Sequence, residues 1–283
     1  MFISNVGYKQ ERIDKMKVIV LMGSPRKKDS YNVCKLIEEI LQKKCTAEFE
    51  YVFLKDYMIE DCKGCDMCFK KSENLCPCKD DVPRIKEKLL NADGIVFATP
   101  VYAYQVPSPL KRLFDRLSYL FHRQELIGKP ALTVVTTGGG GHKQVSKYLK
   151  MTMCGWGCNL VGAINIISPM FFENKNDTSA WGYDEYYHKT NVQKIERFGK
   201  NFMEIIENNK PPIPTFYDIF MFNCLRSKTF TSQADYDFWK EKGWINSNYF
   251  YDVQINLLKR AFGSVLKTII NSVGKNLKDK SIQ

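Results

Sequence analysis

Short apolar runs that stop at turn residues alternate along this chain with segments of helical periodicity. Residues 17–22 form the first run, which ends at the Gly-Ser-Pro turn of residues 23–25. An uninterrupted apolar run bounded by turn residues is typical of a strand buried on both faces. Further runs occupy residues 49–54, 94–98, 131–136 and 160–167, with helix-like apolar spacing between them. Five strands separated by helices predict an α/β domain with a parallel sheet.

Ligands bind such sheets beyond the carboxyl ends of the strands, where the strand order reverses. The loops that follow the predicted strands are therefore the places to look for chemistry. They are residues 23–32, 55–81, 99–108 and 136–143.

The first loop, residues 23–32, has the features of a phosphate site. It leaves a buried strand and enters a helix, where backbone N–H groups carry partial positive charge. Ser24, Ser30 and Asn32 can donate hydrogen bonds to a phosphate. Arg26 adds a fixed positive charge. An ordinary strand-to-helix turn with a basic tip is the alternative interpretation.

The second loop, residues 99–105, carries Tyr102 and Tyr104 directly after a buried strand. A flat ring with a polar edge, such as an isoalloxazine, needs apolar or stacking cover on its face and donors at its edge. Tyrosines that merely cover the sheet edge are the alternative.

The third loop contains four consecutive glycines, Gly138 to Gly141, followed by His142. Glycines let the backbone approach a ligand closely and adopt unusual dihedral angles. A flexible strand-to-helix connection is the alternative. His142 is interpreted as a solvated or capping residue.

Half of the ten cysteines lie between Cys62 and Cys78. Cys62, Cys65 and Cys68 form a C-x2-C-x2-C pattern, and Cys76 follows with a proline after it. This spacing is similar to the ferredoxin pattern for [4Fe–4S]. An iron–sulfur cluster is favoured, with free thiols and then zinc as alternatives. Cys78 is a competing thiol that leaves the fourth ligand open.

Together these loops resemble the NADPH-dependent FMN reductase family of the flavodoxin-like superfamily, and more narrowly its iron–sulfur flavoprotein branch. The resemblance covers about residues 17–208, and residues 215–283 match nothing in the pattern. It implies a flavodoxin-like fold with strand order 2-1-3-4-5 and a homodimer or homotetramer. The matching residues are Gly23-Ser24-Pro25-Arg26, Ser30, Asn32, Cys62, Cys65, Cys68, Cys76, Asp80-Asp81, Thr99-Pro100-Val101-Tyr102, Lys111, Asp115-Arg116 and residues 137–141.

The resemblance also implies the cofactors. FMN would bind through its phosphate at residues 24–32 and through its ring at residues 99–104 and 137–141. Cys62, Cys65, Cys68 and Cys76 would hold a [4Fe–4S] cluster that passes electrons to FMN. Tyr31 stands where smaller residues are usual, which suggests a rearranged phosphate pocket. The predicted cofactor-binding residues are Ser24, Arg26, Ser30, Tyr31, Asn32, Pro100, Val101, Tyr102, Ala103, Tyr104, Thr137, Gly138, Gly139, Gly140 and Gly141.

The predicted activity is that of an FMN-dependent oxidoreductase. Electrons would come from NAD(P)H or a ferredoxin-like donor and pass to a small acceptor such as a quinone, a nitro compound or a flavin. The alternatives are an electron-transfer iron–sulfur flavoprotein without a small-molecule substrate and a zinc-stapled interaction module. No side chain is assigned as a catalytic acid or base, because the cofactor supplies the redox chemistry.

The chain is predicted to have three parts. Residues 1–16 are an N-terminal extension, 17–210 the flavodoxin-like domain and 211–283 a helical extension set off by a proline-rich linker. Apolar residues at helical spacing between residues 255 and 278, interrupted by lysines, indicate a basic amphipathic helix. Packing against protein is favoured for this helix, and contact with an acidic membrane surface is the weaker alternative.

The net charge of +11 is spread along the chain without a basic cluster, so no nucleic-acid partner is expected. No apolar stretch is long enough to span a bilayer, and the first residues lack a hydrophobic signal core. A cytoplasmic location is expected, where thiols stay reduced.

Overall fold

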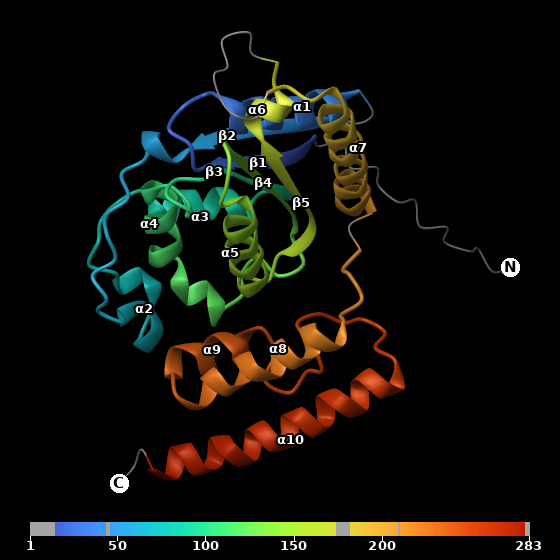
Figure 1. Cartoon of the computed structure of the whole chain (residues 1–283). Helices are drawn as coiled ribbons and strands as arrows, with labels where there is room; N and C mark the ends of the chain where they lie inside the picture. Colours follow the sequence, from blue (N-terminus) through green and yellow to red (C-terminus); the bar gives the residue numbers. More distant parts are fainter. Residues whose placement is uncertain (1–14, 44–45, 174–181, 209, 281–283) are drawn as a thin grey trace, which may run out of the picture.

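The computed structural model describes residues 15–43, 46–173, 182–208 and 210–280 (Figure 1). Its centre is a five-stranded parallel sheet in the order β2-β1-β3-β4-β5, which confirms the predicted flavodoxin-like topology. The strands are β1 (Met16–Met22), β2 (Ala47–Phe53), β3 (Gly94–Pro100), β4 (Pro130–Thr137) and β5 (Asn159–Ile167). Residues 1–14 of the predicted N-terminal extension lie outside the described residues.

Strand β1 is buried on both faces, as its uninterrupted apolar sequence predicts. Val18 and Val20 belong to the apolar core on one side of the sheet, and Ile19 and Leu21 to the core on the other. Each of these side chains is almost inaccessible to solvent. The alternation fixes the register of the strand, because a slip by one residue would exchange the two faces.

Helices cover both faces of the sheet (Figure 1). The core on one side is closed by α1 (Asp29–Gln42) and α7 (Glu185–Asn208). The core on the other side is closed by α3 (Val82–Leu90), α4 (Ser108–Arg116) and α5 (His142–Gly155). Shorter helical turns are η1 (Leu54–Asp56), α2 (Met67–Lys70), η2 (Glu73–Leu75), η3 (Ser118–Phe121) and α6 (Ser168–Phe171).

The C-terminal segment, residues 211–280, has a small apolar core of its own. It contains α8 (Phe216–Arg226), η4 (Ser227–Phe230), α9 (Gln233–Glu241) and α10 (Leu257–Lys280). Thr215 and Asp218 form a reciprocal capping box at the start of α8. The core is mainly aromatic: Phe222, Trp239, Trp244, Tyr249 and Phe250 pack there with Ile219, Leu225 and Ile255.

Helix α10 packs along α8 and leaves an apolar row exposed. Gly263 allows a close approach, because a Cβ there would lie 3.1 Å from the Ile219 side chain. On the other side, Leu258, Val265 and Ile269 are more than half exposed. Within the described ranges, no helix is both long enough and apolar enough to cross a bilayer.

Candidate functional site

Three loops meet at the carboxyl ends of β1, β3 and β4. The Gly23 N–H donates to the carbonyl of Ala98 at 2.8 Å, which ties the first loop to β3. The Val101 N–H donates to the carbonyl of Thr136 at 2.8 Å, which ties the second loop to β4. The Ser30 and Thr136 hydroxyls lie 2.6 Å apart in a buried hydrogen bond. We call this place, formed by residues 24–32, 100–104 and 137–141, the strand-end cradle.

The first loop presents the start of α1 to the cradle. The Ser24 hydroxyl accepts from the Arg26 N–H at 3.1 Å and donates to the Arg26 carbonyl at 3.0 Å, which closes a tight turn. Lys28 precedes α1 and makes no side-chain cap. The first-turn N–H groups of α1 therefore lack a capping side chain, which is the arrangement that suits an anion. Arg26 also reaches across and donates to the Tyr102 hydroxyl at 3.2 Å.

The rings of Tyr31 and its neighbours pack at the β2 edge of the sheet. The Tyr31 ring lies 5.2 Å from the Tyr51 ring and 5.9 Å from the Phe53 ring, measured between centroids. Asn32 is exposed. The extra bulk of Tyr31 is thus accommodated by packing on β2, which leaves Ser30 and backbone groups nearest the turn.

The second loop carries two residues in the left-handed region. Tyr102 and Gln105 exchange backbone hydrogen bonds around a two-residue turn, in which Ala103 has φ 47° and Tyr104 has φ 61°. The left-handed conformation costs about 1–2 kcal/mol for each non-glycine residue. Such strain concentrates at ligand sites, where the surrounding structure holds it. Tyr104 as a residue is 67% exposed, so part of its side chain is accessible to a ligand.

The third loop leaves open space beside its first glycines. The Thr137 hydroxyl accepts from the Gly139 N–H at 3.2 Å and donates to the Gly140 carbonyl at 2.7 Å, which fixes the turn. A Cβ on Gly138 or Gly139 would meet no atom within 4 Å. This side of the cradle is therefore free to receive a flat ligand.

Gly141 lets the third loop touch the second. Its φ is +83°, and a Cβ there would lie 2.8 Å from Val101 Cγ1 and 3.2 Å from Tyr104 Cα. His142 follows, and its Nδ1 is buried without a hydrogen-bond partner among the described residues. Burial, with the neighbouring Lys143 charge, lowers the pKa of the His142 ring.

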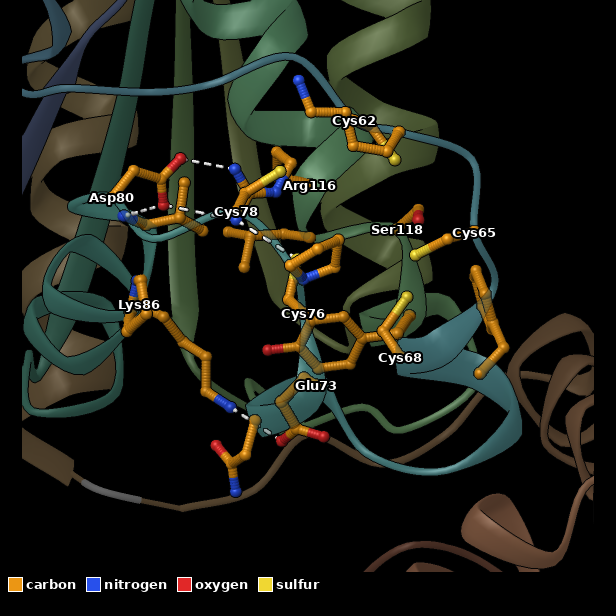
Figure 2. Close-up of a pocket in the computed structure, with 18 of the residues that line it drawn as sticks. Cys62, Cys65, Cys68, Glu73, Cys76, Cys78, Asp80, Lys86, Arg116 and Ser118 are labelled. Atoms are coloured by element: carbon orange, nitrogen blue, oxygen red, sulfur yellow. Dashed lines mark hydrogen bonds and ion pairs between the residues drawn. The ribbon is translucent and has the colours of Figure 1, made fainter.

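The cysteine segment surrounds a separate cavity of about 480 Å³ (Figure 2). All four predicted ligands and the competing thiol line it, together with Glu73, Lys86 and Arg116. The cysteines are Cys62, Cys65, Cys68, Cys76 and Cys78. We call this space the cysteine cavity.

A buried ion pair lies where the two ends of the cysteine-containing loop, residues 55–81, come together. We call this segment the cysteine loop. Asp80 pairs with Arg116, and both side chains are almost completely buried. Asp80 also accepts from the Glu60 N–H at 2.8 Å, and Asp81 accepts from the Met58 N–H at 2.8 Å. These contacts bring the two ends of the loop together, and they explain why acidic residues follow the cysteines.

The residues around the cysteine cavity supply the thiol donors that an iron–sulfur cluster uses, but their side chains are not gathered into a metal site. Four cysteines of one loop line a common space, and Gly64 and Asp66 on either side of Cys65 have positive φ. Within the described ranges, no three His, Cys, Asp or Glu side chains are close enough to hold a metal ion. Burial, and then the nearby Cys62, raise the pKa of the Cys68 thiol.

The sequence did not indicate the charged residues that hold one wall of this cavity in place. The Arg123 guanidinium pairs with Glu73 at 2.7 Å and with Asp235 at 2.8 Å. The first pair is separated by 50 residues and the second by 112. No spacing rule links residues so far apart, so only the fold could show the contact.

The sheet order defines a flavodoxin-like domain, and the strand-end cradle lies at the edge of the sheet where such domains bind their ligands. The family model described as NADPH-dependent FMN reductase matches residues 16–173. The chain therefore belongs to the NADPH-dependent FMN reductase family and is an FMN-dependent oxidoreductase of the NAD(P)H-dependent class.

Relatives by sequence include iron–sulfur flavoproteins of archaea and bacteria and an NAD(P)H-dependent FMN reductase of Saccharomyces cerevisiae. One from Archaeoglobus fulgidus is 27% identical over 237 residues, covering 81% of this chain and 100% of the relative. One from Methanosarcina thermophila is 35% identical over 153 residues, covering 52% of this chain and 78% of the relative. Among solved structures, RosB with the bound intermediate 8-demethyl-8-formylriboflavin-5′-phosphate has a similar fold, at TM-score 0.53 and 14% identity, covering 86% of this chain and 92% of that chain.

The match to the Archaeoglobus relative corrects the expectation for the C-terminal segment. It covers 81% of 283 residues, which is more than the 210 residues that precede this segment. The similarity therefore continues into residues 211–283, beyond the limit that the resemblance gave.

Proposed function

We propose that FMN binds in the strand-end cradle, where it takes electrons from NAD(P)H and delivers them to a small acceptor such as a quinone, a nitro compound or a flavin. The observation that carries this proposal is the convergence of the three loops, with an uncapped helix start on one side and open space beside Gly138 and Gly139 on the other. Bound FMN would supply the electron-accepting ring, and the protein would position it and limit its contact with water.

Each part of the cradle has a proposed task. The N–H groups at the start of α1, with Ser24, Ser30 and Arg26, hold the phosphate. Tyr102 and Tyr104 cover the ring. Backbone N–H groups of the third loop donate hydrogen bonds to the edge of the flavin ring, where negative charge develops on reduction. The remaining proposed contacts are Tyr31 and Asn32 through their backbone, and Pro100, Val101, Ala103, Thr137, Gly138, Gly139, Gly140 and Gly141.

The cysteine cavity is proposed to hold a [4Fe–4S] cluster on Cys62, Cys65, Cys68 and Cys76. The names of the sequence relatives support this, as does the lining of one cavity by all four cysteines. Cys78 is buried and its Sγ donates to the Asp61 carbonyl at 3.5 Å, within the cysteine loop. Arg116 approaches Cys76 Sγ at 3.5 Å and offers positive charge to a thiolate there.

Replacing Cys76 or Cys78 by serine separates the two candidates for the fourth ligand. We expect C76S to lose most of its iron and C78S to keep it, because the Cys78 thiol already donates to the Asp61 carbonyl. Iron and acid-labile sulfide per chain, measured after anaerobic purification, check this. The assignment is wrong if C78S is the variant that loses iron.

Anaerobic reduction by NADH and NADPH tests the proposed activity. Mixing purified protein with either nucleotide should bleach the flavin absorbance, and an added quinone should restore it over many turnovers. Bleaching without turnover on any small acceptor would favour the alternative of an electron-transfer flavoprotein that serves a ferredoxin-like donor or acceptor. A colourless protein that contains zinc would favour the interaction module.

We also propose that copies of this chain associate through the exposed row of α10, in a reducing cytoplasm. The exposure of Leu258, Val265 and Ile269 supports a protein contact. Sedimentation velocity should show that I269D lowers the oligomer size. Flotation of wild-type protein with acidic liposomes, and no oligomer, would favour the membrane alternative.

A further inference from the structure

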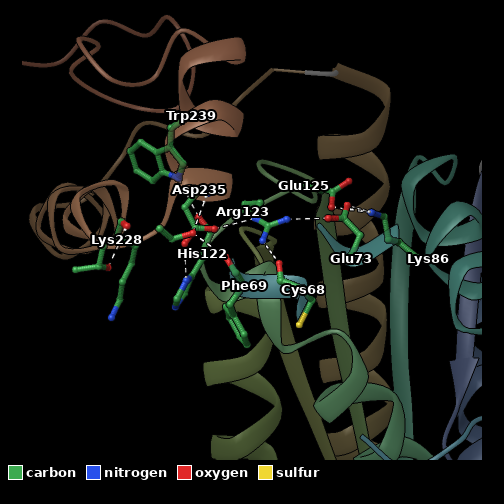
Figure 3. Close-up of polar contacts among 12 residues, drawn as sticks. Cys68, Phe69, Glu73, Lys86, His122, Arg123, Glu125, Lys228, Asp235 and Trp239 are labelled. Carbon is green, nitrogen blue, oxygen red and sulfur yellow. Dashed lines mark hydrogen bonds and ion pairs between the residues drawn. The ribbon is translucent and has the colours of Figure 1, made fainter. Parts of the chain in front are cut away.

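Helix α9 of the C-terminal segment places a buried carboxylate behind the cysteine loop (Figure 3). Asp235 is 0% exposed, and its Oδ1 accepts from Arg123 Nε at 2.8 Å. Its Oδ2 lies 2.8 Å from His122 Nδ1. The carboxylate therefore binds two neighbouring residues of the flavodoxin-like domain at once.

The other end of the Arg123 guanidinium reaches the cysteine loop. Its Nη1 pairs with Glu73 at 2.7 Å, and its Nη2 donates to the backbone carbonyl of Cys68. Arg123 is 3% exposed, so these bonds form away from water. One guanidinium thus joins α9, η2 and the residue that carries a proposed cluster ligand (Figure 3).

Two further hydrogen bonds run along the same contact. The Ser232 hydroxyl, which caps α9, donates to the Phe69 carbonyl at 2.7 Å. The Trp239 indole N–H donates to the His122 carbonyl at 2.9 Å. Both residues that follow the start of α2, Cys68 and Phe69, therefore have their carbonyls held by groups outside the loop.

Helix α2 depends on contacts with the rest of the domain, where its Cys68 and Phe69 pack half-buried against the core. It has four residues and none of them is buried. A single helical turn does not persist in water without outside contacts. Arg123 in turn depends on Asp235, because without this carboxylate the buried guanidinium keeps only Glu73 to balance its charge and loses the acceptor that fixes its Nε.

We propose that Asp235 is a positioning residue for the cysteine cavity: through Arg123 it holds the Cys68 carbonyl, so that the C-terminal segment completes the wall of the site. The identity of the ligand in that cavity rests on the proposed function. The contact by which Arg123 holds the cysteine loop does not. The segment then belongs to the redox site as well as to the overall fold.

Hydrogen exchange of full-length protein tests this, with D235N and R123K compared with wild type. R123K keeps a positive charge near Asp235, but a single ammonium group cannot replace the planar guanidinium that reaches Asp235, Glu73 and the Cys68 carbonyl together. D237N is the matched control, since Asp237 lies on the same helix, is exposed, and bonds only Gln233 among the described residues. Exchange of the α2 amides reports local opening of the cysteine loop, and exchange of the β3 and β4 amides reports the stability of the whole domain.

We expect amides of residues 69–71 to exchange roughly tenfold faster or more in D235N and R123K, with β3 and β4 unchanged. D237N should match wild type. Unchanged exchange in α2 overturns the proposal, and so does an equal acceleration in α2 and the sheet, which would mean global destabilisation. If D235N fails to fold, R123K decides.

Iron release to a chelator separates this proposal from that of the cluster. If wild-type protein holds iron, D235N should lose it several-fold faster than D237N. If wild-type protein, purified anaerobically, holds none, the cluster assignment fails, while the exchange experiment still decides the role of Asp235.

Discussion

Replacing Gly141 by alanine should weaken FMN binding by about 100-fold or more, equivalent to about 3 kcal/mol. The alanine must adopt φ +83° and place its Cβ 2.8 Å from Val101 Cγ1 and 3.2 Å from the Tyr104 backbone. Either the third loop retreats or the strained turn at Ala103 and Tyr104 relaxes. Both changes open the cradle. Titration of apoprotein with FMN, followed by flavin fluorescence, measures the loss.

Gly243→Ala is the control for this prediction. Gly243 has a similar φ of +71° but lies in the C-terminal segment with nothing within 4 Å of a Cβ. It should carry a similar cost in dihedral strain and leave FMN affinity unchanged. Equal FMN affinity in G141A and wild type would show that the contact between the second and third loops does not shape the flavin site.

Replacing Cys68 by serine should abolish the iron content while FMN is retained. Wild-type protein purified anaerobically should hold about four irons per chain, and the variant less than about one. The cysteine cavity and the strand-end cradle share no lining residue, so the flavin should stay at its wild-type occupancy. Iron, acid-labile sulfide and released flavin, measured on one sample, report both sites.

Cys154→Ser is the matched control, because Cys154 is an exposed thiol outside the cysteine loop. It should keep both iron and flavin. A C68S protein with wild-type iron content would remove the cluster from this account. Loss of flavin together with iron would mean that the two sites are coupled more tightly than their separate linings suggest.

The sheet was predictable because each strand carries its own signal. The run at residues 17–22 is apolar on both faces, and the structure buries it on both faces. The strand order came from the family resemblance and is confirmed. The loops at strand ends were predictable for the same reason: carboxyl ends of parallel strands share one edge of the sheet.

The contacts that hold the cysteine loop were not predictable in the same way. Arg123 and Asp235 are ordinary charged residues in the sequence, and nothing in their neighbourhoods marks them as buried. Their pairing depends on how the C-terminal segment folds back on the domain. Similarly, the Tyr31 ring was placed near the phosphate by its position in the chain, whereas its packing on Tyr51 depends on the β2 register.

The most direct test of the central claim is to identify and count the flavin released from purified full-length protein. If the three strand-end loops form one flavin site, denaturation should release FMN, and apoprotein should take it up again to one FMN per chain. A correctly folded protein that neither carries FMN nor binds it on addition would contradict the account.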